Sequence, residues 1–80
     1  MSRLYREMYH PLIAYARSAL SNDALAEEAV QDAFRIGCAK ISEFMGSPNP
    51  NGWITLVLKN VIRNTRRELA SLNKLIVTSI

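Results

Sequence analysis

The chain has 80 residues, one cysteine, one histidine and a formal net charge of +3. This length fits a single domain, and one cysteine (Cys38) with one histidine (His10) excludes an internal disulfide and a zinc cluster of Cys/His type. Every apolar run is far shorter than a membrane span and no signal peptide is apparent, so the sequence predicts a soluble, cytoplasmic protein.

The charges are distributed unevenly along the chain. Residues 1–45 carry five basic and six acidic side chains, whereas residues 46–80 carry five basic and one acidic. This asymmetry indicates two different partner surfaces, and the basic one suits an anion such as nucleic acid.

Three helices are predicted, and the first covers roughly residues 2–20. Its apolar residues, such as Leu4, Met8 and Leu12, recur at helical spacing. Pro11 conflicts with an unbroken helix, because proline lacks the backbone N–H and clashes with the preceding turn. We therefore expect this helix to be kinked or interrupted at Pro11.

A second helix is predicted from the turn Ser21-Asn22-Asp23 to about Met45, because Ser, Asn and Asp favour helix caps. Its apolar stripe comprises Val30, Phe34, Cys38, Ile41 and Phe44. On this stripe Cys38 is expected to be buried and inert. The polar side chains that project away from the stripe are Glu27, Glu28, Gln31, Asp32 and Arg35. Their spacing alone favours an ordinary solvated helix face over a binding surface.

Residues 46–52 are rich in Gly, Pro and Asn and predict a loop. A third helix is predicted from Asn51 or Gly52 to Arg67 or beyond. One of its sides is apolar and comprises Ile54, Val57, Leu58, Val61, Ile62 and Thr65. The other side carries Lys59, Asn60, Arg63, Asn64, Arg66 and Arg67. Such a face either binds nucleic acid or only keeps the helix soluble, and the pattern alone favours neither.

The predicted domain comprises residues 1–68 and leaves an apolar tail over residues 69–80. Lys74 is the tail's one charged residue, and Leu75, Ile76 and Val77 follow it directly. Such a segment either packs on the domain or begins a linker to a further domain.

Nothing in the sequence supports catalysis, a cofactor or a metal site. It has no Gly-rich phosphate loop and no Ser/His/Asp set, and Glu27 and Glu28 would point about 100° apart on a helix. Trp53 is expected to anchor the third helix in the core, in preference to acting as a wedge between bases.

Taken in order, these segments resemble conserved region 2 of bacterial RNA polymerase sigma factors. The stretch from Ala26 to Phe34 resembles the acidic helix of that region. Trp53-Ile54, Asn60 and Arg66-Arg67 resemble its promoter-recognition helix. The loop before Trp53 has the length expected in the small extracytoplasmic-function group. The resemblance covers about residues 3–68.

The resemblance implies an all-α bundle that is not an enzyme and that recognises the −10 promoter element, chiefly on the non-template strand. Asn60 matches a family asparagine that helps to hold a base turned out of the stack, and Asn64 is a second candidate. The basic residues Lys59, Arg63, Arg66 and Arg67 would contact phosphates.

The resemblance also implies a docking surface for core RNA polymerase. It assigns the face formed by Glu27, Glu28, Gln31, Asp32 and Arg35 to the clamp helices, a basic coiled coil in the largest subunit. Charge complementarity at such a surface determines register and association rate more than affinity.

The sequence departs from the family's pattern at three points. Gly37-Cys38 stands where a bulky aromatic residue is usual, and Arg35 stands where leucine is usual. A complete family member also carries a helix-turn-helix domain, so we expect these residues to be one part of a sigma factor.

Three alternatives stay open. The first is a truncated polymerase- or regulator-binding module that does not recognise DNA. The second is a general nucleic-acid binder without polymerase contact, and the third is a structural domain whose dimer buries the tail. An anti-sigma factor is a further candidate partner, whereas no membrane partner is expected.

Overall fold

The computed structural model describes the backbone of residues 2–79 and the side chains of residues 6–72. The described range holds four helices: α1 (Ser2–Leu20), α2 (Asp23–Ala39), α3 (Ile41–Gly46) and α4 (Pro50–Ser79). The predicted all-α bundle of three main helices is confirmed, with the short α3 as an addition. The expectations for the side chains of Leu4 and of Lys74 to Val77 lie outside the described residues.

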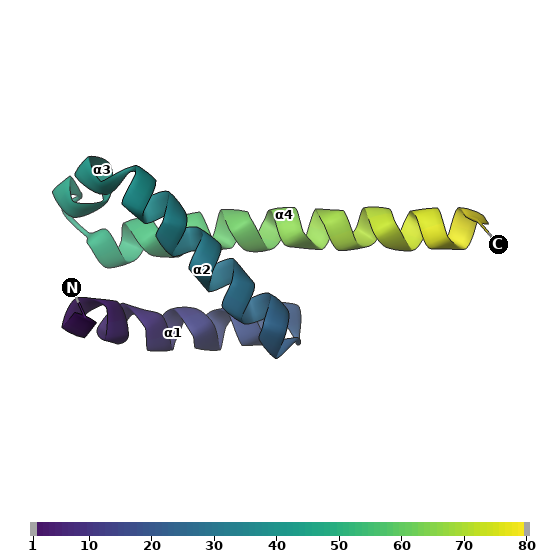
Figure 1. The fold of residues 1–80 in the computed structure, drawn as a ribbon, viewed down its shortest axis with the longest axis horizontal. Helices are drawn as coiled ribbons and strands as arrows, with labels where there is room; N and C mark the ends of the chain where they lie inside the picture. The colour runs from purple at the N-terminus through teal and green to yellow at the C-terminus, as the bar shows by residue number, and fades with distance from the viewer. Residues whose placement is uncertain (1, 80) are drawn as a thin grey trace.

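The three long helices pack against one another in an open arrangement. α1 and α4 run side by side in the same direction, and α2 crosses both of them (Figure 1). The far half of α4 projects beyond the other helices, so the molecule is 49 Å long but only 21 Å and 16 Å in its other dimensions. One side of α4 therefore stays open along much of its length.

α1 is continuous through Pro11, so of the two expected outcomes, a kink or an interruption, the interruption is wrong. Pro11 itself is exposed. Residues on both sides of it are buried against the other helices, namely Met8, Leu12, Ile13 and Ala16. This packing offsets the lost hydrogen bond, which costs about 3 kcal/mol in a helix interior.

The predicted turn between the first two helices is confirmed. Ser21 ends α1 in the left-handed region, with φ of 52°. Asn22 then caps α2, because its side-chain oxygen accepts a hydrogen bond from the backbone N–H of Leu25 at 3.0 Å. Asn22 satisfies a backbone N–H at the start of α2, and Ser21 turns the chain at the end of α1. Short polar residues are common at such helix ends.

The prediction of one helix running to Met45 is wrong, because α2 ends at Ala39 and α3 begins at Ile41. Lys40 between them has φ of −114° and ψ of 43°, which is not helical. The change of direction places Phe44 in the core, where its ring stacks on Trp53 with centroids 5.2 Å apart. Trp53 thus anchors the start of α4, as expected.

The predicted stripe is only partly confirmed: Val30 on α2 and Phe44 on α3 are buried as predicted. Cys38 and Ile41 are exposed and Phe34 is only partly buried, so the expected burial of Cys38 is wrong. The buried residues of α2 are mostly small and comprise Ala26, Ala29, Val30, Ala33 and Gly37. Small residues let helices approach closely. A Cβ atom on Gly37 would lie only 3.1 Å from Phe44 Cδ2 and 3.4 Å from Ile54 Cδ1.

α4 begins at Pro50, one residue before the predicted start. The Asn49 side-chain oxygen accepts a hydrogen bond from Gly52 N at 3.1 Å, and proline is favoured in a first helical turn. Its predicted apolar side is confirmed, with Ile54, Leu58 and Ile62 buried and Val57, Val61 and Thr65 partly buried. The helix continues without a break past residue 68.

Candidate functional site

All six residues of the predicted basic face are exposed on α4. We call this surface the α4 face, and it comprises Lys59, Asn60, Arg63, Asn64, Arg66 and Arg67. Steps of three and four place these side chains on the side of α4 opposite the buried Leu58 and Ile62. The α4 face can therefore meet an extended partner along about two helical turns.

Two members of the α4 face are held by α1. The Lys59 ammonium lies 5.9 Å from the centre of the Tyr15 ring, within the range of a cation–π contact. The Arg66 guanidinium donates a hydrogen bond to the carbonyl oxygen of Ala19 at 2.6 Å. That carbonyl is among the last four of α1, which have no partner within the helix. Arg66 therefore has a structural role that its predicted DNA contact did not include.

The other four members point into solvent. Asn60, Arg63, Asn64 and Arg67 make no hydrogen bond or ion pair with another side chain in the described range. Two amides and two guanidinium groups are thus available to a partner. Amides can both donate to and accept from a base edge, and guanidinium groups suit phosphate oxygens.

Because Arg66 bonds to α1 and Arg63 does not, we expect their substitutions to have different effects on the free energy of unfolding. Arg66→Met should lower the free energy of unfolding by about 0.5–1 kcal/mol, because it removes the donor to the α1 carbonyl. Arg63→Met, which removes an uncontacted guanidinium, should leave it unchanged. Urea unfolding followed by circular dichroism measures both, and equal stability of the two variants would contradict a structural role for Arg66.

The five predicted polymerase-contacting residues lie on adjoining sides of α2, and all but Asp32 are exposed. Glu27 and Gln31 are exposed, whereas Glu28, Asp32 and Arg35 line a groove between α2 and α4. Asp32 is partly buried and pairs with Arg35 at 2.9 Å. Because the pair is open to solvent, it contributes little to stability.

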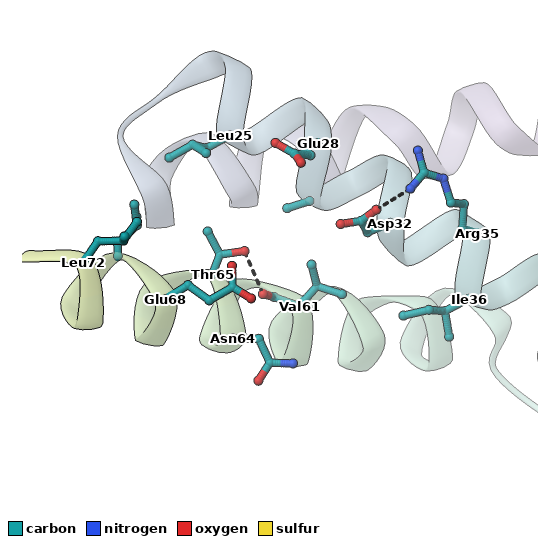
Figure 2. Close-up of a pocket in the computed structure, with 12 residues that line it drawn as sticks. Leu25, Glu28, Asp32, Arg35, Ile36, Val61, Asn64, Thr65, Glu68 and Leu72 are labelled. Carbon is teal, nitrogen blue, oxygen red and sulfur yellow. Dashed lines mark hydrogen bonds and ion pairs between the residues drawn. The ribbon is translucent and has the colours of Figure 1, made fainter. Parts of the chain in front are cut away.

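The groove between α2 and α4 has a volume of about 490 Å³ and combines acidic with apolar side chains. Figure 2 shows Glu28 and Asp32 on α2 across from Thr65 and Glu68 on α4, while the Asn64 amide points away from α2. The apolar lining includes Ile36, Leu69 and Leu72, which are 37%, 38% and 54% exposed. Sequence reasoning did not identify these apolar residues as part of a surface.

No metal-binding group was found in the described part of the chain: it holds no cluster of three or more His, Cys, Asp or Glu side chains. Over the same range, none of the helices combines the length and apolarity needed to span a membrane. The described range therefore presents two candidate surfaces: the polar, mainly basic α4 face, which was predicted, and the groove between α2 and α4, which was not.

Comparison with known proteins gives one match. The family model described as Sigma-70 region 2 matches residues 4–71, which is most of the chain. No curated protein and no solved structure matches the chain with statistical significance. The matched range includes α1 from residue 4, all of α2 and α3, and the part of α4 that carries the α4 face.

Proposed function

The chain belongs to the sigma-70 region 2 family, and from this we propose that it holds core RNA polymerase with α2 while α4 recognises the −10 promoter element. The family acts in transcription initiation through RNA polymerase and promoter DNA and is not a family of enzymes. The extracytoplasmic-function type and action in the cytoplasm are part of the proposal.

The proposed DNA recognition rests on the four residues of the α4 face that contact no other side chain in the described range, namely Asn60, Arg63, Asn64 and Arg67. Arg63 and Arg67 are one turn apart and exposed, so both can reach phosphates of one strand. Asn60 and Asn64 lie beside them with free amides, which suit the edges of unpaired bases. Phosphate contacts supply affinity, and the amides supply base preference.

The polymerase half of the proposal rests on the acidic side chains of α2. Glu27, Glu28 and Gln31 are exposed along two turns, and Asp32 borders them from the groove. A basic coiled coil, which the family resemblance implies as partner, complements this charge. The apolar residues of the groove would add buried area at the edge of such a contact.

Reversal of one acidic charge tests the polymerase half. Asp32→Lys is expected to weaken association with bacterial core RNA polymerase about tenfold, because it places a cation against a basic partner and repels Arg35. Association is measured by surface plasmon resonance or by competition for the enzyme.

Glu43→Lys on α3 is the control, since it makes the same change of charge at an exposed carboxylate outside α2. The control should bind as the unmodified chain does. Equal losses in both variants, or no loss in Asp32→Lys, would show that α2 does not dock on polymerase in the proposed way. The second outcome would favour a nucleic-acid binder without polymerase contact.

A further inference from the structure

Three cations of the α4 face follow one another at steps of four residues. They are Lys59, Arg63 and Arg67, and all three are exposed. Each step advances about 6 Å along α4 and keeps nearly the same side of the helix. We call these three residues the cation row. Arg66 lies outside the cation row, because its guanidinium donates to the Ala19 carbonyl oxygen of α1.

The cation row is not a favourable arrangement in the free protein. Lys59 and Arg63 carry like charges at four residues' separation on one helix, and such pairs repel each other. The lysine side chain is also long and flexible, so it loses much rotamer freedom when a partner fixes it. A Lys59 side chain without support would therefore turn away from Arg63 for much of the time.

α1 supplies the support for Lys59. The Lys59 ammonium lies 5.9 Å from the centre of the Tyr15 ring. Tyr15 is 43% exposed, and the positions Leu12 and Ala16 beside it on α1 are buried against the other helices. No carboxylate in the described range pairs with Lys59. The ring attracts the cation through its π-face and does not neutralise it, so the positive charge stays available to an anion.

We propose that Tyr15 is a positioning residue for DNA recognition: its ring holds the Lys59 ammonium at the end of the cation row, where Lys59 and Arg63 can contact phosphates of the same strand. The inference rests on the proposed function and adds a residue of α1 that does not itself touch DNA. A side chain that is already ordered in the free protein loses less freedom on binding, so the ring raises affinity through Lys59.

Substitutions at Tyr15 test the role of the ring, with fluorescence anisotropy of a labelled single-stranded oligonucleotide of randomised sequence. Tyr15→Leu keeps apolar bulk but removes the π-face, and it should weaken binding about two- to fivefold. Tyr15→Phe keeps the ring and should bind as tightly as the unmodified chain. Unchanged affinity in the leucine variant, or an equal loss in the phenylalanine variant, would overturn the proposal. Thermal unfolding of each variant verifies that the fold is intact.

A double-mutant cycle tests whether Tyr15 acts through Lys59. Lys59→Met should weaken binding and reduce the slope of log affinity against log salt by about 0.7, as expected for one phosphate contact to a single strand. In a chain that already carries Lys59→Met, Tyr15→Leu should cause no further loss, because the group that it positions is gone. A further loss would mean that Tyr15 contacts DNA itself. An unchanged salt slope in Lys59→Met would mean that Lys59 contacts no phosphate. Either result overturns the proposal.

A variant of another member of the cation row keeps this inference separate from the proposed function. Arg63→Gln leaves Tyr15 and Lys59 unchanged and should weaken binding. If Arg63→Gln weakens binding and Tyr15→Leu does not, the proposed function stands and the positioning role of Tyr15 is wrong. If none of the variants changes affinity, both are wrong.

Discussion

The double variant Arg63→Glu, Arg67→Glu is expected to lose affinity for single-stranded DNA by about 100-fold or more. Each arginine is exposed and uncontacted, and a charge-assisted hydrogen bond contributes about 1.5 kcal/mol or more. Two such contacts correspond to about 3 kcal/mol, or about 100-fold in the dissociation constant. Repulsion between the new carboxylates and phosphates adds to this loss. Fluorescence anisotropy at several salt concentrations measures it.

The matched control reverses two basic charges elsewhere. Arg6→Glu, Lys40→Glu produces the same change in net charge from exposed positions on α1 and at the end of α2. It should keep most of the affinity. If both double variants lost the same affinity for DNA, binding would depend on net charge alone. Full affinity in Arg63→Glu, Arg67→Glu would favour a module that docks on polymerase or a regulator without recognising DNA.

Leu58→Ala is expected to remove a large part of the stability of the domain. Leu58 is fully buried, with 0% of its surface exposed, and truncation of a buried leucine costs about 2–5 kcal/mol. An 80-residue domain has a total stability of about 4–12 kcal/mol. The midpoint of thermal unfolding should therefore fall by about 10 °C or more. Circular dichroism follows the transition.

Leu56→Ala, two positions earlier on α4, is the control for this experiment. Leu56 is 63% exposed, so its truncation should change the free energy of unfolding by no more than about 0.5 kcal/mol. Comparison of the two variants tests which side of α4 faces the core. A larger loss for Leu56→Ala than for Leu58→Ala would contradict the buried side described for this helix.

Features that depend on neighbouring residues could be predicted from the sequence. The cap at Asn22 and the apolar side of α4 both follow from local rules on helix ends and helical spacing. The exposure of the α4 face follows from the same periodicity, because helical spacing places its residues away from the buried Leu58 and Ile62. The all-α class and the approximate extent of the third helix also follow from these local rules.

Features that depend on packing could not be predicted in this way. The pattern on α2 placed Phe34 and Cys38 on the buried side, whereas the buried positions are mostly alanines and Gly37, which let the neighbouring helices approach closely. The same packing ends α2 before Lys40, so that Phe44 reaches Trp53. Helical periodicity carries no information on how near a neighbouring helix will come.

The candidate site was predictable only as a set of exposed residues on single helices. The contact between Arg66 and Ala19 joins residues 47 positions apart, and the contact between Lys59 and Tyr15 also joins α4 to α1. The division of the α2 residues between the groove and open solvent depends on the angle at which α2 crosses α4. None of these follows from spacing along one segment.

The contacts of Lys59 and Arg66 with α1 set a length scale for the DNA contacts that we propose for the α4 face between them. From Lys59 to Arg66 the helix rises about 10 Å. A stacked DNA strand advances about 3.4 Å per nucleotide, so this stretch matches about three consecutive nucleotides. Because α1 contacts both ends of this stretch, we expect a footprint of this size, and a longer DNA element would need contacts from other helices.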